Sequence, residues 1–450
     1  MTAAAFAAAP PAVRQAVFPS KSIGKYYFVT ANEYYGTAQK SAVGTVVIDP
    51  SLILVLRPTE QFTAKPANWK LIPKEVEGLD FQDMDTEKST MHGVITSIPH
   101  LKYLTFNNTE ADDSFLQKLP PLPELGCIIA NNTAVSGTGI KQFGKFPQLR
   151  QAAIGSTLIK DEDCDALATL CPNLTDLRLQ RTAIGNKACP GIAKFSKLTG
   201  LTLSSTAITS AGIRALYPLH KTLRTLDVFG TDIGDEGLAA VAKFDQLIGL
   251  TYCDTKKARC TPKGIAALST APALTGLDLN QSNVGDEVVR AIPQALPRLT
   301  SLTVTHCRNI TDGAFAGSFA KMVRLENVRA GETAAGDNLL KGAAHCKALR
   351  TLIAGTNAGD AGLKALSDAK SPVQILILDN SKVTDKGAAY LASLPNVNVL
   401  SLSGTALTDA SVPALSKLKS VHGLAVQNTG MTNEGVAKLQ AALPRCRVLH

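Results

Sequence analysis

A short pattern of apolar and polar positions, L-x-x-L-x-L, recurs along the chain from about residue 76 to its end. In the copy that begins at Leu174, Leu177 and Leu179 are separated by one polar residue, and this alternation places both on one face of a strand. Successive copies begin 24 to 27 residues apart, a spacing that chance does not hold over so long a stretch. The first positions of the fifteen copies are Val76, Leu101, Leu125, Leu149, Leu174, Leu198, Leu223, Leu247, Leu274, Leu299, Leu325, Leu349, Val373, Val397 and Val421.

A small hydroxyl residue stands eight positions after the first position of most copies. There the chain leaves the strand and turns, so the short side chain is expected to bond backbone groups that the turn frees. Stacked copies would form a ladder of such residues, in which Cys307 takes the place once and Thr356 comes one residue early. The ladder residues are Thr109, Thr133, Thr157, Thr182, Thr206, Thr231, Thr255, Ser282, Thr333, Ser381, Thr405 and Thr429.

A short amphipathic segment follows each turn. Leu238, Val241 and Phe244 are three residues apart, which places them on one face of a helix. Asp or Ser in the turn, as at Asp409, is expected to cap the helix. Each copy is therefore predicted to run strand, turn, helix and return.

These units predict an α/β solenoid of about fifteen repeats, with a curved parallel β-sheet inside and short helices outside. The pattern resembles the leucine-rich-repeat family, in its cysteine-containing or ribonuclease-inhibitor-like type, whose units read L-x-x-L-x-L-x-x-T-x-I-T-D-x-G-L. Matching stretches lie at 198–213, 306–313 and 397–409, and the ending at 439–448 is similar to that of bacterial, planctomycete-like repeat proteins. The resemblance implies the fold and leaves the partner open, because the family binds many unrelated molecules.

The first 75 residues are predicted to form a tail and a β-rich capping segment, and residues 76–450 the repeat domain. Many of the aromatic residues lie before residue 71, and strand-like runs occur at 25–30, 44–48 and 52–56. The end of a solenoid exposes an apolar layer and needs a cap. A small aromatic binding module is the alternative. The first sixteen residues are interpreted as a flexible tail or the remnant of a processed leader.

Charge and cysteine content change this picture only slightly. The net charge of +9 suggests an anionic partner, but no long basic run occurs, which favours a mildly basic, solvated surface. The nine cysteines are odd in number and form no CxxC pair, so we expect reduced thiols that pack as small apolar residues in a cytoplasmic protein. An exported protein with a processed leader is the alternative, and no apolar stretch is long enough to span a membrane.

Three cysteines recur at one distance from an apolar position that is expected to open a strand. They are Cys171 before Leu174, Cys346 before Leu349 and Cys446 before Leu449.

No motif of a known enzyme class is present in the sequence: there is no G-x-S-x-G, phosphate-binding loop, H-E-x-x-H or EF-hand loop. The seven histidines lie far apart along the chain. We therefore expect no catalytic residues, no metal site and no cofactor.

The second, fourth and sixth residues after each first position should line the inner face of the sheet. Most are small or polar, and the charged ones comprise five acids and two bases. Phosphate binding needs Lys and Arg, so this slightly acidic face argues against nucleic acid there. The charged residues are Asp80, Asp176, Arg178, Asp227, Asp278, Arg329 and Asp379.

Large apolar residues on this inner face are candidate contacts for a partner. Ile353, Ile375, Ile377 and Val399 fall in three successive units and should form one patch, which a partner, a second copy of the chain or a neighbouring loop would cover. The further candidates on this face are Tyr103 and Phe229, and Ile129 lies there too.

A basic loop in the longest unit, with Lys256, Lys257 and Arg259, is a second candidate contact, for an anion or an acidic partner. A solvated loop is the plainer interpretation. The function predicted from the sequence is a non-catalytic protein–protein interaction scaffold that binds through its concave face or rim, with a homodimer as one possibility. A regulatory subunit of a separate enzyme and an envelope- or polysaccharide-binding protein are the alternatives.

Overall fold

Short strands begin two residues after each first position of the repeated pattern in the computed structural model, as Asp176 follows Leu174. The structure describes residues 14–31, 33–34, 36, 38–85, 87–255 and 259–450. The chain divides into two compact units, Met1–Thr202 and Leu203–His450. The interpretation of the first residues as a tail or leader remnant falls largely outside the described residues.

The first unit begins with a β-rich segment. Its strands are β1 (Arg14–Phe18), β2 (Gly24–Thr30), β3 (Lys40–Ser41), β4 (Gly44–Ile48) and β5 (Leu52–Pro58). The three strand runs expected from the sequence are β2, β4 and β5. Strands β1 and β4 pair antiparallel, as do β2 and β5, and β5 then pairs parallel with the first repeat strand, β6. The segment thus continues the sheet of the repeats.

The repeats of the first unit supply six parallel strands. They are β6 (Gly78–Asp80), β7 (Tyr103–Thr105), β8 (Cys127–Ile129), β9 (Gln151–Ala153), β10 (Asp176–Arg178) and β11 (Gly200–Thr202). The helices are α1 (Glu60–Thr63), α2 (Lys88–Thr96), α3 (Asp113–Lys118), α4 (Gly137–Ile140), α5 (Asp163–Leu170) and α6 (Cys189–Ile192), with 3₁₀ helices at Pro66–Leu71, Lys141–Lys145 and Asn186–Ala188.

The second unit repeats the same strand–turn–helix layer, with parallel neighbours from β12 to β21. Its strands are β12 (Thr225–Phe229), β13 (Gly249–Cys253), β14 (Gly276–Asp278), β15 (Ser301–Thr303), β16 (Asn327–Arg329), β17 (Thr351–Ile353), β18 (Ile375–Ile377), β19 (Val399–Ser401), β20 (Gly423–Ala425) and β21 (Arg447–Leu449). Its helices are α7 (Ser210–Ala215), α8 (Gly234–Val241), α9 (Pro262–Ala267), α10 (Asp286–Ala295), α11 (Asp337–Ala343), α12 (Asp360–Asp368), α13 (Asp385–Leu391), α14 (Val412–Leu415) and α15 (Asn433–Ala442). Its 3₁₀ helices are Tyr217–Leu219, Leu268–Thr270, Asp312–Phe315, Ser318–Lys321 and Asp409–Ser411.

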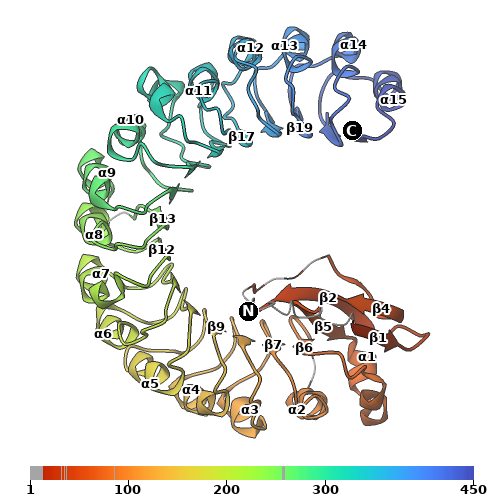
Figure 1. Ribbon diagram of the computed structural model, residues 1–450, viewed down its shortest axis with the longest axis vertical. Coiled ribbons are helices and arrows are strands. Elements are labelled where there is room, and N and C mark those ends of the chain that lie inside the picture. The colour runs from red at the N-terminus through yellow and green to blue at the C-terminus, as the bar shows by residue number, and fades with distance from the viewer. Residues whose placement is uncertain (1–13, 32, 35, 37, 86, 256–258) are drawn as a thin grey trace, which may run out of the picture. The chain divides into compact units, whose positions relative to one another are not determined.

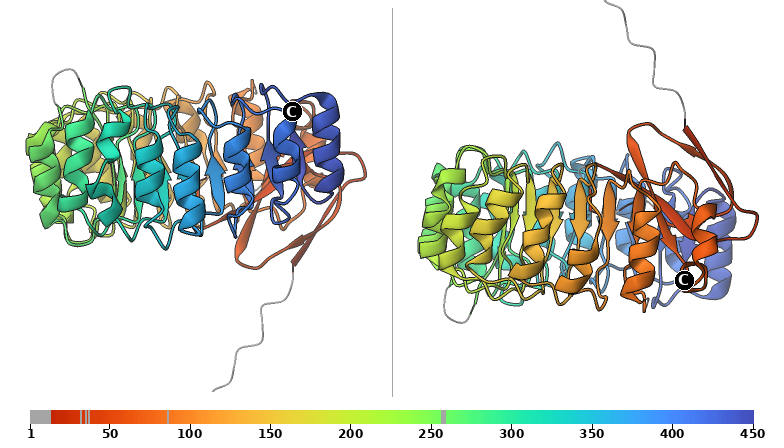
Figure 2. Two further views of the ribbon diagram at one scale, coloured as in Figure 1. Left: turned by 90° about the horizontal axis from the view of Figure 1, so that it is seen from above. Right: turned by 90° about the horizontal axis from the view of Figure 1, so that it is seen from below.

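The core of each unit lies between the sheet and the helices that cover one of its faces (Figure 1). The second residue of each repeat strand from β6 to β20 points into this core, as Leu177, Leu250 and Leu376 do, all at most 2% exposed. Leu238 and Val241 of α8, with Phe244, are buried against it, as their spacing predicts. The repeat strands of each unit run side by side in one direction (Figure 2), and the predicted α/β repeat fold is confirmed.

The predicted hydroxyl ladder is present at most of its positions. Thr206 Oγ1 donates to the carbonyl of Leu203 over 2.6 Å, and Thr182 bonds Leu179 in the same way. Each bond joins a side chain to the carbonyl three residues earlier, where the strand has ended. The other bonds of this kind come from Thr109, Thr133, Thr157, Thr231, Thr333, Thr405 and Thr429.

The residue just before most ladder positions turns the chain with a positive φ. Asn132 has φ of 55° and Ser205 also 55°, while Gly404 occupies the same place with 69°. A left-handed conformation is least costly for Gly and for residues such as Asn. This conformation recurs through the repeats and fixes the direction in which the chain leaves the sheet.

The expectation that Asp caps the helix of its own unit is wrong at most turns. In α13 the cap is Thr384, whose Oγ1 accepts from the amide of Lys386. Asp385 instead bonds the next repeat, where its carboxylate accepts the amide of Thr408 at 2.8 Å and the hydroxyl of Thr408 at 2.6 Å. Asp112 does cap its own helix, α3, and Ser136 caps α4, as expected. The carboxylates that bond forward in this way also include Asp113, Asp235, Asp286, Asp312, Asp337, Asp360 and Asp409.

All nine cysteines are free and buried, as predicted. Burial raises the pKa of the thiols, for example to about 12 at Cys171 and to about 11 at Cys346. The expectation that Leu449 opens a strand is wrong, because Leu424 pairs with Val448 and Leu449 is therefore the last residue of β21. This strand adds one more layer after the copy that begins at Val421.

Candidate functional site

Four predicted contact residues come together on the face of the second unit's sheet that points away from the helices. Ile375 is directly beside Val399 in the strand register, and Ile353 is beside Ile377. Adjacent strands lie about 4.8 Å apart, so the four side chains are neighbours. Ile375 is 38% exposed and Val399 39% exposed, while Ile353 and Ile377 are half-buried. We call these four residues the isoleucine patch.

The remaining candidates of the second unit do not join this patch. Phe229 ends β12 and is half-buried, five strands before the patch begins. Arg259 is exposed in the loop between β13 and α9, and Lys256 and Lys257 lie outside the described residues. Asp254 holds the described end of this loop, because its carboxylate accepts the amide of Cys260 at 2.8 Å.

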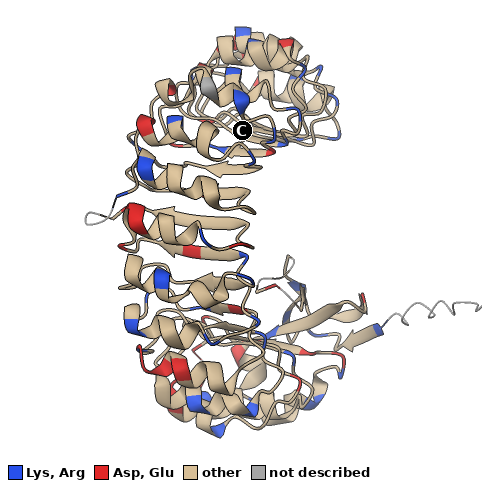
Figure 3. Ribbon diagram, turned by 60° about the vertical axis from the view of Figure 1, so that its left-hand side comes forward, with Lys and Arg blue, Asp and Glu red and all other residues tan. Residues whose placement is uncertain are grey.

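Charged residues also lie on this face of the second unit. Arg329 of β16 is exposed and pairs directly with Ile353 of the isoleucine patch. Asp278 of β14 is largely buried, and this burial raises the pKa of its carboxyl group. Asp379 is engaged by its neighbours, since it accepts the hydroxyl of Ser401 and the amide of Ser403. Acidic and basic residues are interspersed along the ribbon (Figure 3).

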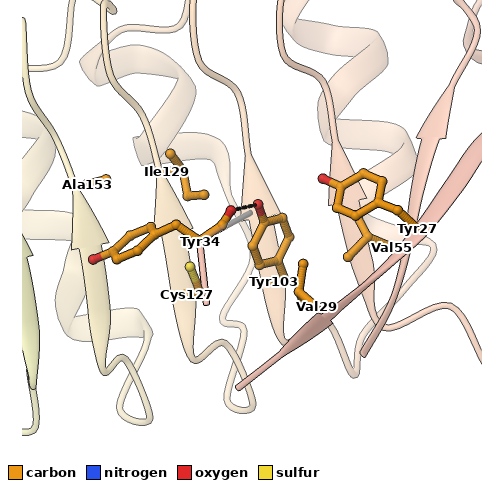
Figure 4. Packing of buried hydrophobic residues seen from close by; sticks show 8 residues of the cluster. All are labelled: Tyr27, Val29, Tyr34, Val55, Tyr103, Cys127, Ile129 and Ala153. Atoms are coloured by element: carbon orange, nitrogen blue, oxygen red, sulfur yellow. Dashed lines mark hydrogen bonds between the residues drawn. The ribbon is translucent and has the colours of Figure 1, made fainter. Parts of the chain in front are cut away.

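In the first unit, the chain after β2 lies across the corresponding face of the sheet. Tyr34 donates its hydroxyl to the carboxylate of Asp176 at 2.8 Å, and the guanidinium of Arg178 lies 3.8 Å above the centre of its ring. Its backbone carbonyl accepts the hydroxyl of Tyr103 at 2.7 Å. Figure 4 shows Tyr34 packed beside Cys127 of β8. Asp176 and Arg178, two of the charged residues predicted for the inner face, are therefore already in contact with Tyr34 of the same chain.

Tyr103 is only 2% exposed, so its selection as an exposed contact residue is wrong. Tyr34, Tyr27 and Val29 of the N-terminal segment share one buried cluster with it, as do Cys127 and Ile129 (Figure 4). The alternation of the strand placed Tyr103 on the correct face. Nothing in the local pattern indicated that residues from a distant segment cover that face.

A polar cavity of about 210 Å³ lies between the N-terminal segment and β6, β7 and β8. At its wall, Asp80 accepts the hydroxyl of Tyr27 at 3.0 Å and the amide of Gln82 at 2.9 Å. The guanidinium of Arg57 lies 3.8 Å from the same carboxylate. Burial raises the pKa of Asp80, and it also raises the pKa of Tyr27. The sequence marked Asp80 as an inner-face acid but gave no sign of this cavity.

Among the described residues, no group of three or more His, Cys, Asp and Glu side chains is arranged to hold a metal ion. No helix in the described part of the chain is long and apolar enough to cross a membrane.

Comparisons with known proteins agree with this repeat architecture. Residues 220–242 match a family model described as Leucine Rich repeat. An internalin of Listeria monocytogenes has a TM-score of 0.51 and 18% identity, over 75% of this chain and 88% of the internalin. A leucine-rich-repeat protein of Leptospira interrogans has a TM-score of 0.50 and 16% identity, over 88% of this chain and 99% of that protein.

A complex of Rad7 and Elc1 from yeast aligns with a TM-score of 0.48 and 16% identity, over 81% of this chain and 88% of the yeast chain. No curated protein sequence matches this chain. At such low identities, structural likeness establishes the fold alone.

Proposed function

Since the chain is a leucine-rich-repeat protein, we propose that it is a non-catalytic scaffold that binds a protein partner through the sheet face of its second unit. The observation that carries this proposal is the isoleucine patch: Ile353, Ile375, Ile377 and Val399 present adjoining apolar side chains on strands β17 to β19. Contiguous exposed apolar surface is typical of a contact site.

The strand framework supports the use of this patch as a rigid contact surface. The neighbouring residues Leu352, Leu376 and Leu400 point into the core and are at most 1% exposed. The patch residues are therefore held by a packed layer and lose little conformational freedom when a partner binds. Aliphatic side chains are weaker anchors than Trp, Tyr or Arg, so the contact they supply is modest.

The first unit offers less of this face to a partner. Tyr34 is hydrogen-bonded to Asp176 and stacked under Arg178, and the N-terminal segment buries Tyr103. We therefore assign the partner to the second unit, with the loop at Arg259 as the runner-up contact.

The test is Ile377→Asp, which places a charge in the isoleucine patch without touching Leu376 or Leu378 in the core. We expect a melting temperature near that of the wild type and at least about tenfold weaker association with the partner, or dissociation of a homodimer. Affinity purification with mass spectrometry identifies candidate partners, titration calorimetry measures their affinities, and sedimentation measures the oligomeric state.

The matched control is Val323→Asp, since Val323 is 53% exposed and lies outside the patch. A specific partner is retained by the wild type and by Val323→Asp but lost from Ile377→Asp. Full-strength binding by Ile377→Asp would exclude the patch and direct the search to Arg259. Unfolding of Ile377→Asp would show that this residue belongs to the core.

A further inference from the structure

The polar cavity beneath the N-terminal segment contains a buried hydroxyl group that lacks a partner. Thr105 lines the cavity from the end of β7 and is 2% exposed. Its Oγ1 has no hydrogen-bond partner within the described part of the chain. Buried polar groups in native proteins are nearly always bonded, so an unpaired hydroxyl at a cavity wall indicates a bond that is made to something else.

The strand register places this hydroxyl beside the buried carboxylate. Asp80 ends β6 and is paired directly with Thr105 on β7. Their side chains leave the same face of the sheet on strands about 4.8 Å apart. A ligand hydroxyl between them can donate to Asp80 and accept from Thr105, because one O–H group is both a donor and an acceptor.

The charges at the cavity indicate a neutral ligand. Asp80 and Arg57 are the acid and the base that line it, and their charged groups lie 3.8 Å apart. Each offsets the other, so neither a cation nor an anion gains a net attraction. The carboxylate and the guanidinium still offer a strong acceptor and strong donors to hydroxyl groups.

The walls and the size of the cavity narrow the ligand class further. Tyr27, Tyr34 and Tyr103 contribute aromatic surface next to the polar groups. The volume of about 210 Å³ is below the roughly 300–1,000 Å³ that drug-sized ligands occupy. We propose that this cavity binds a neutral polyhydroxylated molecule of monosaccharide size, which the Thr105 hydroxyl and the Asp80–Arg57 pair hold against the tyrosines.

The test measures binding of a defined panel to the full chain by ligand-observed NMR and calorimetry. The panel contains methyl glucoside, methyl mannoside, methyl galactoside, N-acetylglucosamine and myo-inositol, with tetramethylammonium and acetate as charged probes. We expect at least one neutral probe to bind, and to bind more tightly than either charged probe.

The variant Thr105→Val tests the assigned hydroxyl without disturbing the fold, because it replaces an unpaired buried hydroxyl by a methyl group of similar size. We expect an unchanged or higher melting temperature together with about tenfold weaker binding of the neutral probe. Thr105→Ser keeps the hydroxyl and should retain binding.

The matched control is Thr202→Val, since Thr202 occupies the same strand position in β11 and does not line this cavity. The proposal is overturned if no neutral probe binds, if a charged probe binds more tightly, or if Thr105→Val binds as well as the wild type. Equal loss of binding in Thr202→Val would also overturn it. Because the probes are small molecules, these outcomes are independent of the partner tests on the isoleucine patch.

Discussion

At the scale of single residues, most of the ladder threonines donate to the backbone carbonyl three residues earlier, near the end of the strand. Thr206 shows the arrangement: its side chain is 9% exposed and donates to Leu203 over 2.6 Å. The bond needs a short side chain with a donor, which explains why Thr is the commonest residue at this position. The sequence predicted this role correctly because donor and acceptor are only three residues apart.

Thr206→Val should lower the free energy of unfolding by roughly 1–3 kcal/mol, because the buried carbonyl of Leu203 loses its donor. Urea denaturation monitored by circular dichroism measures the change. Thr206→Ser keeps the hydroxyl and is the control. Equal stability of Thr206→Val and the wild type would contradict the structural role of the bond.

At the scale of the elements, a carboxylate at the start of many helices bonds the next repeat. Asp385 begins α13 and bonds both the amide and the hydroxyl of Thr408, which caps the following turn. The stack therefore carries a polar link between neighbouring layers in addition to its apolar core. Sequence analysis placed the Asp correctly in the turn but assigned it the wrong partner. A helix cap can be inferred from neighbouring residues, whereas the bond to Thr408 depends on how two repeats stack.

Asp385→Ala should destabilise the second unit by about 1 kcal/mol, because two bonds to Thr408 are lost at a partly exposed site. Asp368→Ala is the control: that carboxylate pairs with Lys364 inside its own helix, and its removal should cost less. Thermal unfolding of the two variants gives the comparison. A larger effect at Asp368 would refute the assignment of Asp385 as an inter-repeat link.

At the scale of the whole molecule, the buried thiols make stability depend on pH in one direction. Burial raises the pKa of Cys253 to about 11 and that of Cys164 to about 12, from an ordinary value of 9.0. Above pH 9.0 the unfolded chain loses these thiol protons while the folded chain keeps them. Their contribution to stability is therefore complete below pH 9.0 and declines as the pH rises toward 11 and 12.

The urea midpoint should accordingly fall between about pH 8 and about pH 10.5. Cys164→Ala removes one of the titrating groups and should make this fall shallower. A midpoint that stays constant or rises with pH would show that the thiols are ionised to the same extent in both states.

Removal of metal ions should leave the molecule unchanged. The core of each unit consists of packed apolar layers, and no metal-binding group of side chains occurs among the described residues. Prolonged dialysis against EDTA is expected to keep the melting temperature within measurement error. A drop of many degrees would reveal a site that the described residues do not account for.

The order of the repeats could be predicted from the sequence because each strand from β6 to β20 begins two residues after its Leu or Val anchor. The isoleucine patch could be predicted from the same spacing, because Ile375 and Val399 are one repeat apart and therefore pair on neighbouring strands. The burial of Tyr103 and the polar cavity could not be predicted, since both depend on the placement of Tyr34, whose hydroxyl bonds a residue 142 positions away. Periodicity reports which face a residue is on and carries no information about a distant segment that covers it.

The contact between Tyr34 and Asp176 also has a consequence for how the protein emerges from the ribosome. Synthesis proceeds from the N-terminus at about 5–20 residues per second, so Asp176 appears roughly 7–28 s after Tyr34. During that time the Tyr34 hydroxyl has only water to bond in place of the Asp176 carboxylate. The bond that fixes Tyr34 to β10 can therefore form only after residue 176 has been made, so the N-terminal segment reaches its final placement later than its position in the chain suggests.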